Sequence, residues 1–410
     1  MNVLVWLVFA CAAIAAAYQL FQVFATWLFL RRTRALATPT SARSLPPVTL
    51  LKPLKGPGVD LYANLASFCR LDYPSYQIVF GVEDPADPAA AVVQQLRRDF
   101  PERDIVLSVD QLPGANRKVA NLRHMMTHAR HGILVMSDSD VRVRPDYLRV
   151  MVAPLVDGKL PAKGDRRVGL TTCLYRGVGR FGLPSVFESL FINTDFTPMV
   201  LSAQLVQRFR YAYGASIAFR REALEKIGGF AAIADYLADD YLLGNRIADA
   251  GYKLVLLPYV VDTVLDSVRL RDVWRHLLRW SRTYRVQQPA GWFASVITHT
   301  IPWGMLALLV SGGSAAGWAL FATAIAVRFA SLVAILRLLR ETDTQRHLWL
   351  VPLKDVVASV MWAAAFLGRT VEWSDQMFRV ERDGRMVALT PPIPATPAAA
   401  ERQRLRAAGS

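Results

Sequence analysis

The chain has 410 residues, of which 53% are hydrophobic, and its formal net charge is +15. This length provides one large or two medium domains, and the apolar fraction is higher than an ordinary soluble enzyme carries. Three scattered cysteines exclude a disulfide framework and a zinc-binding spacing, and the basic residues cluster beside apolar segments, which argues against a nucleic-acid partner.

The first 30 residues contain no charged side chain and predict an N-terminal transmembrane helix at 1–30. About 20 residues are enough to cross the hydrocarbon core of a bilayer. The arginines of "RRTR" (31–34) follow at once and place the next domain in the cytoplasm by the positive-inside rule. A signal peptide is the alternative, because "AAA" (15–17) resembles a cleavage site, but no basic residue precedes the apolar run. A basic, proline-rich linker is expected at 31–47.

Residues 48–288 alternate apolar, strand-like runs with helix-like stretches. The predicted strands are 48–53, 77–84, 104–109, 132–138, 168–175 and 252–261. Continuous apolar runs bounded by turn residues predict an α/β domain whose mostly parallel sheet is covered by helices on both faces. Sheets of this kind bind ligands beyond the carboxyl ends of their strands.

Apolar segments return at 289–370, which we predict to form membrane or interfacial helices. Three stretches carry the apolar residues: 295–310, 315–336 and 348–367. Arg328 falls inside the second stretch and is expected to face protein or a water-filled cleft. The third is interrupted by Lys354 and Asp355, so it could span the bilayer, re-enter it or lie at its surface. The remaining residues, 371–410, are expected to form a cytosolic tail.

Acidic side chains follow two of the predicted strands. Asp138 and Asp140 in "DSD" could hold a hard divalent cation together with diphosphate oxygens, and the alternative is a helix cap or Asx turn. Glu83, Asp84 and Asp87 in "VEDPADP" could accept hydrogen bonds from a nucleoside, and the alternative is a polar loop. Because the carboxyl ends of parallel strands share one edge of a sheet, we expect both sets at that edge.

Two further motifs carry charge, one in a predicted loop after a glycine turn and one at the start of a predicted helix. Arg117 and Lys118 in "GANRKVANL" would suit an anionic substrate, although a solvated loop explains them equally well. Asp239 and Asp240 in "YLADDYLLG" open a predicted helix. There they either complement the helix dipole or supply a general base.

The segment "WRHLLRWSRTYR" (274–285) predicts a helix with His276, Arg279 and Trp280 on one face. Arg279 and the indole of Trp280 could close a phosphate-binding active site. The alternative is a basic interfacial helix whose arginines line the membrane surface. The arginines concerned are Arg275, Arg279, Arg282 and Arg285.

In their order and spacing, these motifs resemble the ceramide glucosyltransferase-like family of inverting, membrane-bound glycosyltransferases (families 21 and 2). The signature of that family is an acid at a first strand end, a second acid motif, a later acid and a "(Q/R/H)xxRW" box. Here the corresponding motifs are "VEDPADP", "DSD", "ADD" and "HLLRW". The opening "LLKPLKG" is similar too, and the resemblance covers residues 48–288 and the first membrane anchor.

Within that family the chain is most similar to the bacterial hopanoid-biosynthesis branch, through "GANRKVANL", "SDSDVRV", "TCLYRG" and "ADDYLLG". It departs from the animal ceramide enzymes at three positions. Asp140 completes a D-x-D where their motif looks like "DSG", Asp195 stands near a position where they carry histidine, and Asp239 replaces a glutamate. These departures put ceramide in doubt as the acceptor.

The resemblance implies a GT-A, Rossmann-like domain on the cytoplasmic face of a bacterial inner-membrane, multi-pass protein. It implies that Asp240, with Asp239 beside it, acts as the base, and that Asp138 and Asp140 bind Mg²⁺ or Mn²⁺ on the UDP diphosphate. The donor-binding residues would be Glu83, Asp84, Asp87, Lys118, Asp138, His276, Arg279 and Trp280.

The implied reaction transfers a sugar from UDP-N-acetylglucosamine to bacteriohopanetetrol in the bilayer. A ceramide glucosyltransferase using UDP-glucose is the alternative. Two rival classes stay open: a processive polysaccharide synthase, which usually carries "QxxRW" and a longer helical bundle, and a non-enzymatic membrane scaffold, which would not need the acids.

Overall fold

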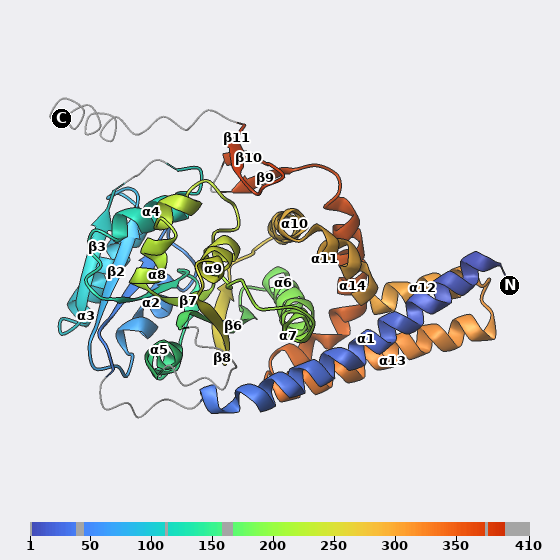
Figure 1. The fold of residues 1–410 in the computed structure, drawn as a ribbon. Coiled ribbons are helices and arrows are strands. Elements are labelled where there is room, and N and C mark those ends of the chain that lie inside the picture. Colours follow the sequence, from blue (N-terminus) through green and yellow to red (C-terminus); the bar gives the residue numbers. More distant parts are fainter. Residues whose placement is uncertain (1, 38–44, 111–113, 158–166, 374–375, 390–410) are drawn as a thin grey trace.

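The computed structural model describes residues 2–37, 45–110, 114–157, 167–373 and 376–389. Residues 38–44 of the linker expected at 31–47 and the end of the expected tail lie outside these residues. Within them, a sheet domain carries helices on both faces, and a group of long helices extends away from it toward the N-terminus (Figure 1).

The central sheet contains eight strands in the order β3-β2-β1-β4-β7-β6-β8-β5. Their bounds are β1 (Val48–Pro53), β2 (Tyr76–Val82), β3 (Asp104–Val109), β4 (Ile133–Ser137), β5 (Val141–Arg142), β6 (Val168–Gly179), β7 (Ser216–Arg220) and β8 (Lys253–Leu265). Only β5 and β7 run against the other strands of this sheet. The expected α/β class with a mostly parallel, Rossmann-like sheet is therefore confirmed, and β5 and β7 are strands that the apolar pattern did not predict.

The sheet is buried on both faces because alternate residues of its central strands enter different cores. Leu50 pairs in register with Ile78 and Val135, and all three pack on the face covered by α2, α3 and α5. The neighbouring residues Leu51 and Leu134 pack on the face covered by α4, α8 and α9. These helices are α2 (Leu61–Cys69), α3 (Pro88–Asp99), α4 (Arg117–Met125), α5 (Tyr147–Asp157), α8 (Arg221–Lys226) and α9 (Asp239–Asp249).

A second layer of helices joins this domain to the apolar part of the chain. It contains α6 (Leu183–Phe191), α7 (Thr197–Val206), α10 (Leu270–Gln287), α11 (Pro289–Ala294) and α14 (Val351–Ala364). Helix α14 contacts α6, α10 and α12. Helix α14 has 14 residues, begins after a 3₁₀ turn and is not among the helices long enough to cross a membrane. Two charged residues on it, Lys354 and Asp355, are buried.

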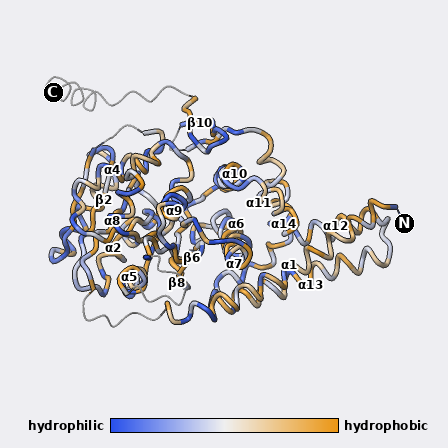
Figure 2. The backbone as a smooth tube through the Cα atoms, viewed as in Figure 1, coloured by the Kyte–Doolittle hydropathy of each residue, from blue (hydrophilic) through white to orange (hydrophobic). Residues whose placement is uncertain are grey.

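Among the described residues, two helices are long and apolar enough to cross a membrane: α1 (Val3–Thr33) and α13 (Ala315–Leu338). They pack against each other and against α12 (Thr300–Val310), and all three are strongly hydrophobic in Figure 2. A bend of 63° separates α12 from the preceding helical residues 289–298. These two segments form a third span only if they cross the membrane together as one broken helix. The chain is therefore a membrane-associated protein.

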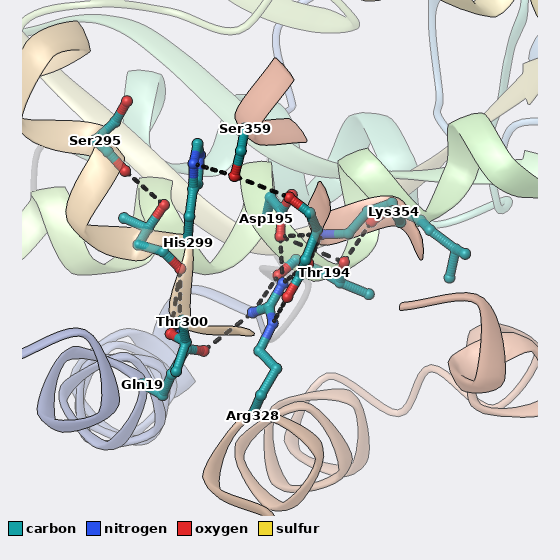
Figure 3. Close-up of polar contacts among 12 residues, drawn as sticks. Gln19, Thr194, Asp195, Ser295, His299, Thr300, Arg328, Lys354 and Ser359 are labelled. Carbon is teal, nitrogen blue, oxygen red and sulfur yellow. Dashed lines mark hydrogen bonds and ion pairs between the residues drawn. The ribbon is translucent and has the colours of Figure 1, made fainter. Parts of the chain in front are cut away.

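A network of charged side chains connects these helices to α14 and to the turn between α6 and α7, which carries Asp195 (Figure 3). Arg328 on α13 is 2% exposed and donates from Nε and Nη2 to the Asp355 carboxylate, at 3.0 Å each. It also donates to Asp195 Oδ1 at 2.6 Å and to Gln19 on α1 at 3.0 Å. Lys354 Nζ lies 2.6 Å from both Asp195 and Asp355. Arg328 thus faces protein, as expected, with two carboxylates and two cations in balance.

Residues of the expected tail form a second sheet of three antiparallel strands, β9 (Thr370–Trp373), β10 (Gln376–Val380) and β11 (Met386–Ala388). Part of the arginine row on α10 binds this region. Arg282 donates to the carbonyl oxygens of Leu367 and Thr370, and Arg285 donates to that of Gly368. These two arginines therefore hold the C-terminal segment against α10, whereas the alternative of an interfacial helix had them lining the membrane surface.

Candidate active site

Carboxylates from two distant segments meet at the carboxyl edge of the sheet. Asp138 follows β4, and Asp240 lies in the first turn of α9. Both face Gly214, just before β7: a Cβ atom there would lie 3.1 Å from Asp240 Oδ2 and 3.7 Å from Asp138 Oδ2. Glycine leaves room for the two carboxylates to approach each other, and the strand that follows it, β7, was not predicted from the sequence.

Lys118 joins these carboxylates from a third segment. It lies in the first turn of α4, which Asn116 caps by accepting a hydrogen bond from the Val119 amide at 3.1 Å. Lys118 Nζ is 2.7 Å from Asp138 Oδ1 and 3.4 Å from Asp239 Oδ2. The structure therefore brings three of the motifs singled out in the sequence into direct contact.

A second lysine, Lys52, lies beneath the site and was not assigned a role from the sequence. Its Nζ donates to Ser137 Oγ at 3.3 Å and to the Asp138 carbonyl oxygen, and it lies over the Phe68 ring at 3.8 Å. Burial lowers the pKa of Lys52 to about 7, although Asp140 and Asp138 act in the opposite direction. Lys52 fixes the backbone from which the D-x-D side chains project.

Burial makes two of the carboxylates weak acids. Burial and then the charge of Asp138 raise the pKa of Asp140 to about 7, against the opposing effect of Lys52. Burial and then Asp239 raise the pKa of Asp240 to about 6, against Lys118. A carboxyl with a pKa near 6 is ionised at neutral pH and still basic enough to accept a proton.

The D-x-D pair has the chemistry of a partial metal site. Within the described ranges, no group of three or more His, Cys, Asp or Glu side chains is placed to hold an ion. Asp138 and Asp140 nevertheless supply carboxylate oxygens, which Mg²⁺ and Mn²⁺ prefer. Asp140 Oδ1 is buried and accepts no hydrogen bond from any described residue. The pair fits an ion that takes its other oxygen ligands from a bound diphosphate and water.

Helix α10, which carries the "HLLRW" motif, faces the same carboxylates. Burial lowers the pKa of the Arg279 guanidinium, and Asp138, Glu188 and Asp239 oppose that shift. His276 and Trp280 lie on the same face of α10, with ring centroids 4.3 Å apart. Arg279 is thus a half-buried cation near the carboxylate cluster.

Glu188 on α6 holds the histidine of the box. Its side chain is 1% exposed, and Oε1 lies 2.5 Å from His276 Nδ1, while Ser267 donates to the other carboxylate oxygen. This glutamate belongs to none of the motifs that were singled out in the sequence. An isolated acid within an apolar helical stretch was the available signal, because a buried carboxylate requires partners.

The first acid motif is largely engaged in local contacts. Glu83 pairs with Arg117 through Nε at 2.8 Å. Asp87 caps α3 by accepting from the Ala89 amide at 2.8 Å, and it also accepts from the Gly56 amide at 3.0 Å. Asp84 accepts only from the Ala86 amide, at 2.8 Å, among the contacts of the described chain. Of the three acids, Asp84 retains the most capacity for a ligand.

The topology and the site define a membrane-anchored α/β protein of the GT-A type. A model of glycosyl transferase family 21 matches residues 7–386, and the chain belongs to this family. It is 27% identical over 238 residues to ceramide glucosyltransferase 3 of Caenorhabditis elegans, which covers 58% of this chain and 50% of the relative.

Two further proteins are similar to this chain, one over a shorter stretch and one at lower sequence identity. The chain is 34% identical over 122 residues to ceramide glucosyltransferase of Candida albicans, which covers 26% of this chain and 22% of that protein. The mannosyltransferase PcManGT from Pyrobaculum calidifontis, in complex with GDP-Man and Mn²⁺, is similar over 87% of this chain and 96% of its own, at 22% identity and a TM-score of 0.48. The chain spans about half the length of the Caenorhabditis relative.

Proposed function

We propose that this protein is an inverting glycosyltransferase that moves a sugar from a UDP-sugar to a hydroxyl group of a membrane lipid. One observation carries the proposal: Asp240, a carboxyl with a pKa raised to about 6, lies beside a D-x-D pair. A scaffold has no use for four carboxylates gathered at the edge of a sheet, because their mutual repulsion destabilises the fold.

The donor would bind at the carboxyl edge of the sheet. Asp84 would accept hydrogen bonds from the uridine, and Lys118 and Arg279 would contact the diphosphate. Mg²⁺ or Mn²⁺ held by Asp138 and Asp140 would neutralise charge on the departing diphosphate. The Lys118–Asp138 ion pair, 2.7 Å long, would then open as phosphate oxygens replace the carboxylate at the ammonium.

Asp240 would act as the general base. It removes the proton of the acceptor hydroxyl while that oxygen forms a bond to the anomeric carbon. The bond from this carbon to the diphosphate oxygen breaks on the opposite face, and UDP leaves with the electron pair. One carboxylate suffices because no covalent sugar intermediate forms. Asp239 supports this role, since its negative charge contributes to the raised pKa of Asp240.

The acceptor is proposed to be a lipid because membrane helices adjoin the catalytic domain. The arginines after α1 favour a cytoplasmic catalytic domain in a multi-pass protein of the bacterial inner membrane. The hopanoid-like motifs support N-acetylglucosamine transfer to bacteriohopanetetrol. Ceramide glucosylation is the second candidate, because the Caenorhabditis elegans and Candida albicans relatives are ceramide glucosyltransferases.

The test is a matrix of two donors and two acceptors. The purified protein in detergent, with Mg²⁺ or Mn²⁺, receives UDP-N-acetylglucosamine or UDP-glucose and either bacteriohopanetetrol or ceramide, and products are identified by mass. A hexosamine adduct of the hopanoid that is absent with Asp240→Asn supports the first candidate, and glucosylceramide supports the second. A normal product yield from Asp240→Asn would overturn the mechanism. Donor binding without product from either lipid would overturn both acceptors.

A further inference from the structure

Four tyrosines from separate segments form a group that includes Tyr241, the residue after the proposed base. Tyr241 directly follows Asp240 in α9, and its ring stacks on Tyr211 with centroids 5.8 Å apart and an interplanar angle of 18°. Gln288, between α10 and α11, donates from Nε2 to the Tyr241 hydroxyl. The phenol next to the base is therefore oriented by a residue at the start of the membrane-associated helices.

Tyr284 continues this group along α10, on the same face as His276 and Trp280 at intervals of four residues. Burial raises the pKa of Tyr284 to about 12, and the neighbouring phenols Tyr211, Tyr18 and Tyr241 add to the rise. Tyr18 lies on α1. We call these four residues the tyrosine cluster (Tyr18, Tyr211, Tyr241 and Tyr284); Tyr211 and Tyr241 stack, and Gln288 lies against Gly291 together with the Tyr284 hydroxyl and donates to Tyr241.

The first turn of α11 closes the cluster on its other side. Trp292 packs edge-on against Tyr284 with centroids 5.6 Å apart. Its indole N–H is buried and donates no hydrogen bond to any described residue. A Cβ atom on Gly291 would lie 3.0 Å from the Tyr284 hydroxyl oxygen, so this glycine lets the hydroxyl lie against the backbone. A buried donor without an acceptor costs free energy unless a ligand or water supplies one.

Phenol side chains suit one type of ligand in this position. Each offers an apolar ring face and a hydroxyl group that both donates and accepts. A lipid whose headgroup carries several hydroxyls on an apolar skeleton matches both properties. Such a lipid could keep its tail beside the apolar helices while one hydroxyl reaches Asp240, because Gln288, just before α11, contacts Tyr241, which follows Asp240 in α9.

We infer that the tyrosine cluster, with Gln288 and Trp292, is the binding site for the polyhydroxylated headgroup of the lipid acceptor. The inference rests on the proposed function. It adds the location of the acceptor, the groups that recognise it and the requirement for several hydroxyls.

The test uses Tyr284→Phe and Tyr241→Phe in the full chain, with Tyr62→Phe as the matched control. Tyr62 also hydrogen-bonds through its hydroxyl, to Asp99, but on the surface of α2 and α3. Bacteriohopanetetrol and ceramide are offered in mixed micelles, and thermal unfolding confirms that each variant is folded. Each cluster variant should raise the KM for the lipid about five-fold, the effect of one lost hydrogen bond, while the KM for the UDP-sugar and the control stay unchanged.

The outcomes separate this inference from the proposed function. If the native protein forms no glycolipid with any donor, the proposed function fails. If the native protein is active but both folded variants keep its lipid KM, or change the donor KM instead, the cluster is not the acceptor site. A single-hydroxyl lipid such as a sterol, used as efficiently as the polyhydroxylated acceptors, would also overturn the inference.

Discussion

The carboxylates at the candidate active site and those of the Arg328 network lie in one chain but ionise differently. Burial and Asp239 raise the pKa of Asp240 to about 6. Burial acts in the same direction on Asp195, yet Lys354 and Arg328 lower the pKa of that carboxyl to about 2. The neighbours, and not the residue type, decide the result.

The difference teaches how each region is used. In the network, two cations and two carboxylates satisfy one another, so that the network stabilises the joint between the membrane helices and the sheet. At the candidate active site, four carboxylates share Lys118, Lys52 and Arg279, which leaves an excess of negative charge for the proposed chemistry. Charge balance therefore indicates a structural role, and carboxylate excess indicates a functional one.

The largest expected effect is on catalysis and comes from substituting the proposed base. Asp240→Asn should lower kcat about 10³-fold, because the amide cannot accept the proton, while donor binding is retained. The measurement is glycolipid formation under saturating donor. Asp249→Asn, at the exposed end of the same helix, serves as control and should keep full activity. Equal losses in both variants would show that the helix and not the base was damaged.

The network half is tested by removing charges singly and in pairs. Lys354→Met leaves Asp195 short of a cation and should cost about 3 kcal/mol of the free energy of unfolding. The double variant Lys354→Met/Asp195→Asn removes one charge of each sign and retains the Arg328–Asp355 pair, so it should recover more than half of that loss. Denaturant unfolding in detergent measures both. A double variant as unstable as the sum of the single variants would contradict the balance argument.

The pH dependence should sharpen the contrast. Because Asp240 must be ionised to act as base, kcat should fall about tenfold per unit below pH 6 and level above it. A pKa raised above the unfolded value of about 3.9 means that Asp240 costs stability as pH rises from about 4 through 6. Asp195, with its lowered pKa, stabilises the fold above about pH 4 and loses this contribution as pH falls toward 2. A pH-independent kcat between 5 and 7 would exclude Asp240 as the base.

The smallest effect separates two acids of the first motif. Asp87→Ala removes the cap of α3 and should cost about 1 kcal/mol of stability with little change in the donor KM. Asp84→Ala should have the opposite profile, with a higher donor KM and unchanged stability. Thermal unfolding and donor titration of the two variants decide between them. A raised donor KM in the Asp87 variant would return that residue to the nucleotide site.

The sequence predicted the parallel strands well because a strand buried on both faces is a continuous apolar run. β1 and β3 have the predicted bounds. β5 has only two residues and β7 follows a glycine, so neither offers a pattern of useful length. The C-terminal strands are short, yet Asp383-Gly384 in "ERDGRM" is a hairpin signal that could have predicted the turn before β11.

The residue types in the sequence predicted the chemistry of the candidate site, but they did not predict which side chains contact each other there. The acids were recognisable because carboxylates at strand ends need an explanation. Lys52 and Glu188 were missed because each lies in an apolar run, and only the three-dimensional contacts show which charge each one meets. Arg328 was visible as an anomaly in an apolar segment, but its partners come from three other elements.

Helix α1 has 31 residues and is about 46 Å long, which exceeds the hydrocarbon thickness of about 30 Å. Its C-terminal part does not enter solvent freely, because Phe29 packs with Val200 and Leu201 of α7. As a membrane span, the helix would have one end in lipid and the other packed against the sheet domain. Bilayers of different thickness would tilt this helix to different degrees and so change the height of Asp240 above the lipid surface. The acyl-chain length of the host membrane then becomes a determinant of how far an acceptor headgroup must rise to react.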